Sequence, residues 1–314
     1  MAGFRGVTAF VAAVALAVLA ACAPKAPEVG PTFIGGTSGL ELAFLPETPP
    51  AEIFDGAKFP FAIALQLRNV GEWDINNSAD ATVTISGIDP ADFGVAPEAL
   101  VKDSPTALPA RKRDPTGAII EGGLSVIEFP GLNFQRTLFG DVSTTIKATV
   151  CYSYGTKIAT NLCIKKNLAS LDPSVCLVNT ERMVANSGAP VQLESVRESQ
   201  AGVDSVLLTL RIKHVGVGRI AQLGSECSEE VAARDRVYLK VDTMMPGLSC
   251  SGLSAVDGSP VTGAEGYVTL YGGERSISCT QPTGGEGDFV KPVSITLSYD
   301  YEQSAFKTIT IKHI

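Results

Sequence analysis

Residues 143–154 read STTIKATVCYSY, and this stretch decides the fold class. Apolar and aromatic side chains at alternate positions, from Ile146 to Tyr154, are separated by polar or smaller ones. Period-two alternation of β-branched and aromatic residues predicts a strand with one face in a core and the other toward solvent. Residues 157–165 follow at once with a similar pattern, and we expect them to return as the hairpin partner of this strand.

Short strands of the same kind recur along the chain, separated by glycine, proline and asparagine turn signals, and no long stretch has a helical period. The clearest is FPFAIALQLR at 59–68. This pattern predicts an all-β protein of two tandem immunoglobulin-like antiparallel β-sandwiches. Other predicted strands lie at 81–85, 118–120, 124–129, 190–196, 205–213, 236–241, 267–271, 276–279, 293–301 and 307–313.

The C-terminal part of the chain repeats the N-terminal part. Residues 148–167 align with 295–314 without a gap, and two further blocks, around 65–75 and 122–127, recur in the same order. Matched positions include Tyr152 with Tyr299, Tyr154 with Tyr301, Gly71 with Gly216, and Gly122-Gly123 with Gly272-Gly273. Such blocks are typical of a duplicated domain. We therefore predict one sandwich at 32–167, a linker at 168–185 and a second sandwich at 186–314.

The N-terminus has the plan of a secretory signal peptide at residues 1–21: Arg5, an apolar run, small residues and then Cys22. The run is shorter than the roughly 20 residues that a membrane-spanning helix needs. LAAC at 19–22 resembles a prokaryotic lipobox, and the resemblance implies cleavage before Cys22 and lipid attachment to it. An ordinary signal peptide whose alanines happen to precede a cysteine is the alternative. Residues 22–31, with three prolines, are expected to form an extended tether.

The chain has seven cysteines, so that six remain if Cys22 carries lipid. An even set in an exported protein predicts disulfides. Cys151 and Cys163 are both missing from the second copy, and since partners are expected to be lost together we pair them. The next pair is Cys250 with Cys279, and Cys176 with Cys227 is what remains.

One loop carries oxygen ligands at a spacing that calcium could use, namely Asp74, Asn76, Asn77 and Asp80. An Asx-rich turn, in which these side chains cap their own backbone, explains the same residues. Otherwise no cofactor is expected. The two histidines, His214 and His313, stand at predicted strand ends, and no nucleophile elbow, zinc motif or phosphate loop is present. We therefore predict no enzymatic activity.

The block LRNVGEWDI at 67–75 resembles adhesion-related immunoglobulin-like modules on bacterial and archaeal surfaces, and the CYSY block resembles small duplicated archaeal surface proteins. The net charge of −8 argues against nucleic acid as a partner. We expect a lipid-anchored, extracytoplasmic structural, adhesion or protein-binding module in the cell envelope, with an unidentified envelope protein as partner. Alternatives are an accessory carbohydrate- or solute-binding lipoprotein with Trp73 exposed, or a minor filament subunit with a free edge strand at 32–44.

Overall fold

The computed structural model describes residues 32–314 apart from residue 286. The described residues hold antiparallel strands, one parallel strand pair, three short 3-10 helices and no α-helix. The predicted all-β class is therefore confirmed. Within this part of the chain, no helix has the length and apolarity needed to cross a membrane. The predicted signal peptide, Cys22 and the tether at 22–31 lie outside the described residues.

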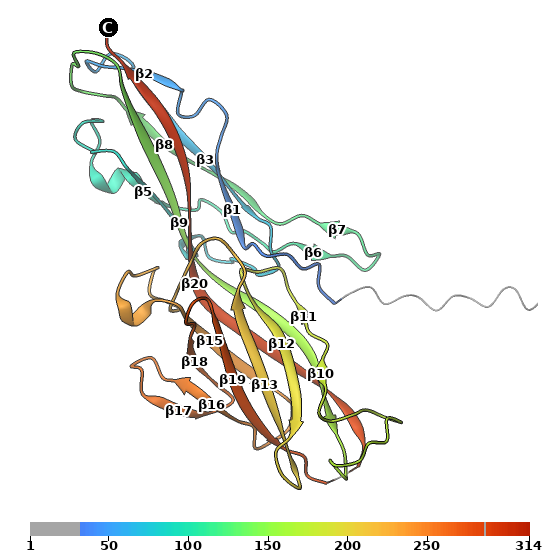
Figure 1. Ribbon diagram of the computed structural model, residues 1–314. Coiled ribbons are helices and arrows are strands. Elements are labelled where there is room, and N and C mark those ends of the chain that lie inside the picture. The colour runs from blue at the N-terminus through green and yellow to red at the C-terminus, as the bar shows by residue number, and fades with distance from the viewer. Residues whose placement is uncertain (1–31, 286) are drawn as a thin grey trace, which may run out of the picture. The chain divides into compact units, whose positions relative to one another are not determined.

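Two long strands organise the fold. Strand β9 spans Val142–Ile164 and strand β20 spans Phe289–Lys312, and they pair antiparallel with no shift of register from Val142↔Ile311 to Ile164↔Phe289. Figure 1 shows them side by side, β9 in green and β20 in red. Every second residue of β9 between Ile146 and Ile164 is buried, so the alternation that predicted a strand continues through the whole of it.

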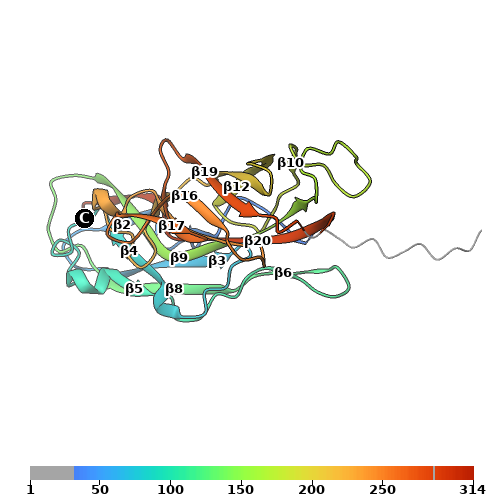
Figure 2. The ribbon, with the colours of Figure 1, turned by 90° about the horizontal axis from the view of Figure 1, so that it is seen from below.

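The first lobe contains a three-stranded sheet in the order β1-β3-β8, at Leu40–Phe44, Phe61–Asn69 and Leu124–Leu132. The opposing strands are β5, β4, the first half of β9, the second half of β20, and β2. Their bounds are Glu52–Phe54 for β2, Ala81–Ser86 for β4 and Val101–Asp103 for β5. Short elements are η1 (Ser78–Asp80), η2 (Pro97–Leu100), β6 (Lys112–Arg113) and β7 (Ile119–Ile120). The β6–β7 hairpin projects from the lobe in both views (Figure 1 and Figure 2).

The second lobe repeats this plan with β12, β13 and β19 in place of β1, β3 and β8. Strand β16 adds to β19, and β10 adds to β12. The opposing strands are β18, β15, the first half of β20, the second half of β9, and β11, with β14 also on β20. The bounds are β10 Glu181–Arg182, β11 Ala185–Asn186, β12 Val191–Gln200, β13 Ser205–His214, β14 Arg219–Ala221, η3 Val231–Ala233, β15 Arg236–Asp242, β16 Ser249–Ser254, β17 Pro260–Gly263, β18 Glu265–Thr269 and β19 Glu274–Pro282.

The lobes differ from the predicted pair of consecutive domains. Each long strand begins in the lobe of its own copy and ends in the other, and one cluster of buried side chains runs through both lobes. Residues 168–185 are not a linker between domains, because β10 pairs with β12 and lies in the second lobe. The expected boundaries at 32–167 and 186–314 therefore do not separate two packing units.

The predicted hairpin between 143–154 and 157–165 is wrong, because the chain does not turn at Gly155. This glycine stands opposite Ser298 inside the ladder, and a Cβ on it would lie 2.8 Å from ring atoms of Trp73. The glycine thus makes room for a tryptophan from the 69–75 segment instead of marking a turn. With no turn, the ladder of β9 and β20 passes from one lobe into the other.

Candidate functional site: the junction of the two lobes

Four tyrosines occupy the middle of the long ladder. Tyr152 stands opposite Tyr301 and Tyr154 opposite Tyr299, and all four are at most 1 % exposed. Their rings meet edge to face, with centroids 5.7 Å apart for Tyr152 and Tyr301. Burial raises the pKa of each hydroxyl, to about 12 for Tyr301, because a phenolate would be desolvated there.

Equivalent tyrosines make equivalent hydrogen bonds in the two lobes. The Tyr154 hydroxyl donates to Asn69 Oδ1 at 3.0 Å and lies 3.3 Å from the Trp73 amide. The Tyr301 hydroxyl lies 2.9 Å from His214 Nε2 and accepts from the Gly218 amide at 2.6 Å. The hydroxyls of the other two tyrosines accept from backbone amides, Tyr152 from Leu40 at 3.1 Å and Tyr299 from Val191 at 3.3 Å.

The repeated glycines have a packing reason. A Cβ at Gly71 would collide with the Tyr154 hydroxyl, and one at Gly216 would collide with the Tyr301 hydroxyl. Two positions before each glycine stands the residue that bonds the same hydroxyl, Asn69 or His214, so the matched blocks of sequence build the same contact twice. The internal repeat that the sequence predicted thus has matching side-chain contacts in the structure.

Glu72 holds the start of the described chain against this junction. Its carboxylate accepts hydrogen bonds from the amides of Ile34, Gly35 and Gly188, at 3.0, 2.8 and 2.7 Å. Three amide donors on one carboxylate are a strong, charge-assisted arrangement. Sequence reasoning missed Glu72, although it directly follows the repeated Val-Gly pair. The segment that continues the predicted tether therefore enters the fold at the junction.

The six cysteines of the described residues form three disulfides. Cys250 pairs with Cys279, as predicted. Cys151 pairs with Cys227, and Cys163 with Cys176, so the predicted pairs Cys151–Cys163 and Cys176–Cys227 are wrong. Because Cys151 and Cys163 lie on one uninterrupted strand, which rises about 3.3 Å per residue, they are too far apart to bond.

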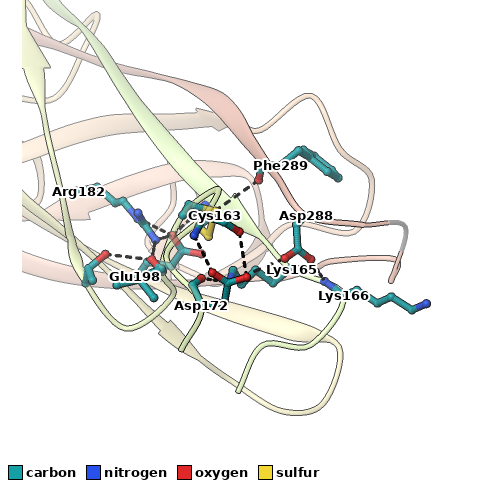
Figure 3. Close-up of a disulfide and its surroundings, with 12 residues drawn as sticks. Cys163, Lys165, Lys166, Asp172, Arg182, Glu198, Asp288 and Phe289 are labelled. Atoms are coloured by element: carbon teal, nitrogen blue, oxygen red, sulfur yellow. Dashed lines mark hydrogen bonds and ion pairs between the residues drawn. A yellow bond between two sulfur atoms is a disulfide. The ribbon is translucent and has the colours of Figure 1, made fainter. Parts of the chain in front are cut away.

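The Cys163–Cys176 bridge lies at the end of β9 in the second lobe, beside buried charges (Figure 3). Glu198 Oε2 accepts from the Cys163 amide at 3.0 Å and from Arg182 Nε at 2.6 Å. Burial raises the pKa of the Glu198 carboxyl. Lys165 is also buried, and its ammonium donates to the Asp172 carbonyl and lies 3.8 Å from the Asp288 carboxylate. Each buried charge thus has a partner, which fastens the 166–175 loop.

An acidic groove of about 740 Å³ opens beside the Cys151–Cys227 bridge, between β4 and β5 of the first lobe and the 224–229 loop of the second. Lys147 is the only cation among its described lining residues. Its carboxylates are Asp80, Asp103, Glu226, Glu229, Asp300 and Glu302. Several of these are already engaged: Asp103 accepts from Thr82, Asp300 from Ser153, and Glu302 pairs with Arg219.

The four predicted calcium ligands do not converge. The Asp74 carboxylate accepts from the Ala110 amide at 2.8 Å, and Asn77 caps η1 by accepting from the Ala79 amide at 3.2 Å. Asn76 is exposed, while Asp80 lines the acidic groove. Among the described residues, no three His, Cys, Asp or Glu side chains are grouped so as to hold a metal. Asn77 thus makes the local capping contact of the alternative interpretation, whereas Asp74 bonds a segment far along the chain.

Trp73 and His214 contact the junction tyrosines, and His313 lies near the C-terminal residue. Trp73 is half-buried against Gly155, with Lys157 Nζ 5.4 Å from the ring centroid. His214 lies at the end of β13 against Tyr301, and His313 Nδ1 lies 2.8 Å from the buried Asp55 carboxylate. None of these contacts places a histidine beside a serine or cysteine nucleophile.

No protein-family model and no curated protein sequence matches the chain. Among solved structures, the chain has a faint likeness to the collagen binding domain of Erysipelothrix rhusiopathiae surface protein RspB, at 9 % identity and a TM-score of 0.12 over 89 % of this chain and 90 % of that one. The T=1 particles derived from infectious bursal virus give 11 % identity and a TM-score of 0.11, over 84 % of this chain and 72 % of that one. At these scores the likenesses carry no argument.

Fold and site together define an all-β protein of antiparallel sheets braced by three disulfides. Disulfides of this kind form and persist outside the reducing cytoplasm. The chain therefore belongs to the class of extracytoplasmic β proteins.

Proposed function

We propose that the protein is a lipid-anchored component of the cell envelope that acts as a structural, adhesion or protein-binding module and not as an enzyme. The observation that supports this most is the ladder of β9 and β20, which continues through both lobes in one register. A shared ladder couples the lobes, since bending between them would break backbone hydrogen bonds on both strands. A rigid, disulfide-braced body suits a module that holds a binding surface at a fixed place.

Rigidity between the lobes is testable by pulsed electron–electron spin resonance. Spin labels are attached to cysteines introduced at Phe139 in the first lobe and Leu171 in the second, two positions whose side chains are exposed and can be labelled. The measurement gives the distribution of distances between the two lobes. We expect a distribution no broader than that of a control pair within one lobe. A broad or two-peaked distribution, compared with the control, would contradict the structural role.

The anchor is tested separately, on cells that express the full-length protein and a Cys22→Ser variant. Mass spectrometry of the N-terminal peptide should find diacylglycerol on Cys22. In detergent phase partition, the wild-type protein should enter the detergent phase and the variant should remain in the aqueous phase. An unmodified N-terminus in the wild-type protein would refute anchoring through Cys22. Cross-linking in intact envelopes would then identify the protein that the module contacts.

A further inference from the structure

A second pocket, of about 700 Å³, lies in the second lobe and shares no lining residue with the acidic groove. Strands β16, β17 and β18 line it, together with the segment of η3. Its charged lining consists of Arg234, Arg236 and Arg275 against the single carboxylate of Asp257. On a chain whose net charge is −8, this pocket is a local concentration of positive charge.

Arg236 provides a fixed cation at the wall of the pocket. Arg236 is only 6 % exposed, and its guanidinium lies 4.6 Å from the ring centroid of Tyr267. The guanidinium donates its hydrogen bonds to neutral acceptors, among them the carbonyls of Ala255 and Val256 at 2.7 and 2.9 Å. No carboxylate of the described residues lies within 4.0 Å of it. Asp257 interacts with this charge only from beyond ion-pair distance, and an anion in the pocket would stabilise the buried guanidinium further.

Arg234 and Arg275 carry guanidinium groups that can reach a ligand. Arg234 Nε donates to the Glu229 carbonyl, and no described residue accepts from its two terminal nitrogens. Arg275 lies 5.1 Å from the ring centroid of Tyr271, and its guanidinium makes no hydrogen bond to the described residues. Neither arginine forms an ion pair in this part of the chain, whereas Arg211, Arg219 and Arg182 all do. Guanidinium forks of this kind bind carboxylates bidentately.

The carboxylate of Asp257 does not form an ion pair with the arginines of the pocket. Its Oδ1 accepts from both the amide and the hydroxyl of Ser259, at 2.9 and 2.7 Å, so it closes its own turn. These bonds, together with the positive charge of Arg236, hold the pKa of Asp257 below its ordinary value. The pocket therefore keeps an excess of positive charge although an acidic residue lines it.

The rest of the lining selects the kind of anion. Tyr271, which is 65 % exposed and has the Arg275 guanidinium over its ring, lines the pocket together with Ser251, Thr262 and Thr269. The volume lies in the range of small-ligand pockets, about 300–1,000 Å³, and is far larger than a single inorganic ion needs. An aromatic face packs against the C–H groups of a sugar ring, while hydroxyls and arginines bind its polar substituents.

From these features we infer that the arginine pocket binds an acidic saccharide, with a uronate-type carboxylate on Arg234 and Arg275 and a sugar ring against Tyr271. This site goes beyond the proposed structural role and uses none of its residues. It also differs from the Trp73 loop, where the sequence suggested a carbohydrate site. Because the disulfides indicate an extracytoplasmic location, polysaccharides bearing carboxylates are accessible to it.

Isothermal titration calorimetry of the full-length protein in detergent micelles tests the assignment, with tetragalacturonate as the probe. Maltotetraose serves as a neutral saccharide of the same length, and sodium phosphate as a free anion. We expect tetragalacturonate to bind and the other two to give no signal at the same concentrations. Raising the salt concentration should weaken the binding, since ion pairs at an open pocket are screened.

The variants Arg234→Gln and Arg275→Gln should each weaken tetragalacturonate binding by about tenfold or more, the loss of one charge-assisted hydrogen bond. Arg113→Gln is the matched control, since Arg113 is an exposed arginine of the β6–β7 hairpin that likewise forms no ion pair with described residues. Equal affinity of all three variants and the wild type would overturn the site. Absence of tetragalacturonate binding, or phosphate binding of equal strength, would overturn the proposal that the ligand is an acidic saccharide. Circular dichroism verifies that each variant is folded.

Discussion

Ser153 donates its hydroxyl to Asp300 Oδ1 at 2.8 Å, across the central residue pair of the β9–β20 ladder. Asp300 is only 2 % exposed, and its second oxygen accepts from the Glu226 amide at 2.9 Å. Glu226 directly precedes Cys227, whose disulfide returns to Cys151 on β9. One buried carboxylate thus connects the ladder to the loop that the disulfide fastens.

Replacing Asp300 by asparagine should destabilise the protein by about 1–3 kcal/mol, because an amide is a weaker acceptor for the Glu226 amide than a buried carboxylate. Urea unfolding of the oxidised protein measures the change. Ser153→Ala, which removes only the neutral donor, should cost less. If the two variants have the same unfolding free energy, Asp300 does not hold the 224–228 loop.

Removing the Cys151–Cys227 disulfide should cost more stability than removing Cys163–Cys176. The sequence separations are 76 and 13 residues, and the loop-entropy relation gives about 4.5 and about 3 kcal/mol. Paired serine variants and thermal unfolding make the comparison. Peptide mapping without reduction should find Cys151 linked to Cys227; a Cys151–Cys163 peptide would contradict the continuous strand.

Stability should fall at alkaline pH because the junction tyrosines are buried. The pKa of Tyr301 is raised to about 12 from 10.0 in the unfolded chain, so the folded state retains its proton where the unfolded state loses it. This contribution is complete below pH 10 and is lost as the pH rises from about 10 to about 12. Urea midpoints across that range should decline less steeply for Tyr301→Phe. An unchanged slope would show that other groups cause the loss.

Glu72→Gln should loosen the first described residues of the chain. The neutral amide accepts more weakly from Ile34, Gly35 and Gly188, and the loss of charge-assisted bonds should cost about 1–3 kcal/mol. Hydrogen exchange at residues 33–36 should accelerate, while exchange in the β9–β20 ladder stays slow. Glu41→Gln, an exposed carboxylate in β1, is the control. Unchanged protection at 33–36 would show that Glu72 does not clamp the segment.

Much of the strand content could be predicted from the sequence, because alternation depends only on which face of a strand is buried. The segment 59–68 became β3 at Phe61–Asn69, and 205–213 became β13 at Ser205–His214. The hairpin predicted at Gly155 was wrong because a glycine can either form a turn or make room for a neighbouring side chain. Gly155 resembles a turn residue in the sequence, and only the position of the Trp73 ring shows why it lies within a strand.

The sequence by itself determined the all-β class, the internal repeat and the presence of six cysteines after Cys22, since periodicity, duplication and composition can be read from the sequence without knowing which segments meet. Tertiary structure alone decided that β9 and β20 cross between the lobes and that Cys151 pairs with Cys227. It also decided that three arginines without an ion pair to the described residues line one pocket. All three outcomes depend on which distant segments meet. For the long strands, the physical reason is that packing of the tyrosine and tryptophan rings at the junction, not any local turn signal, selects the partners.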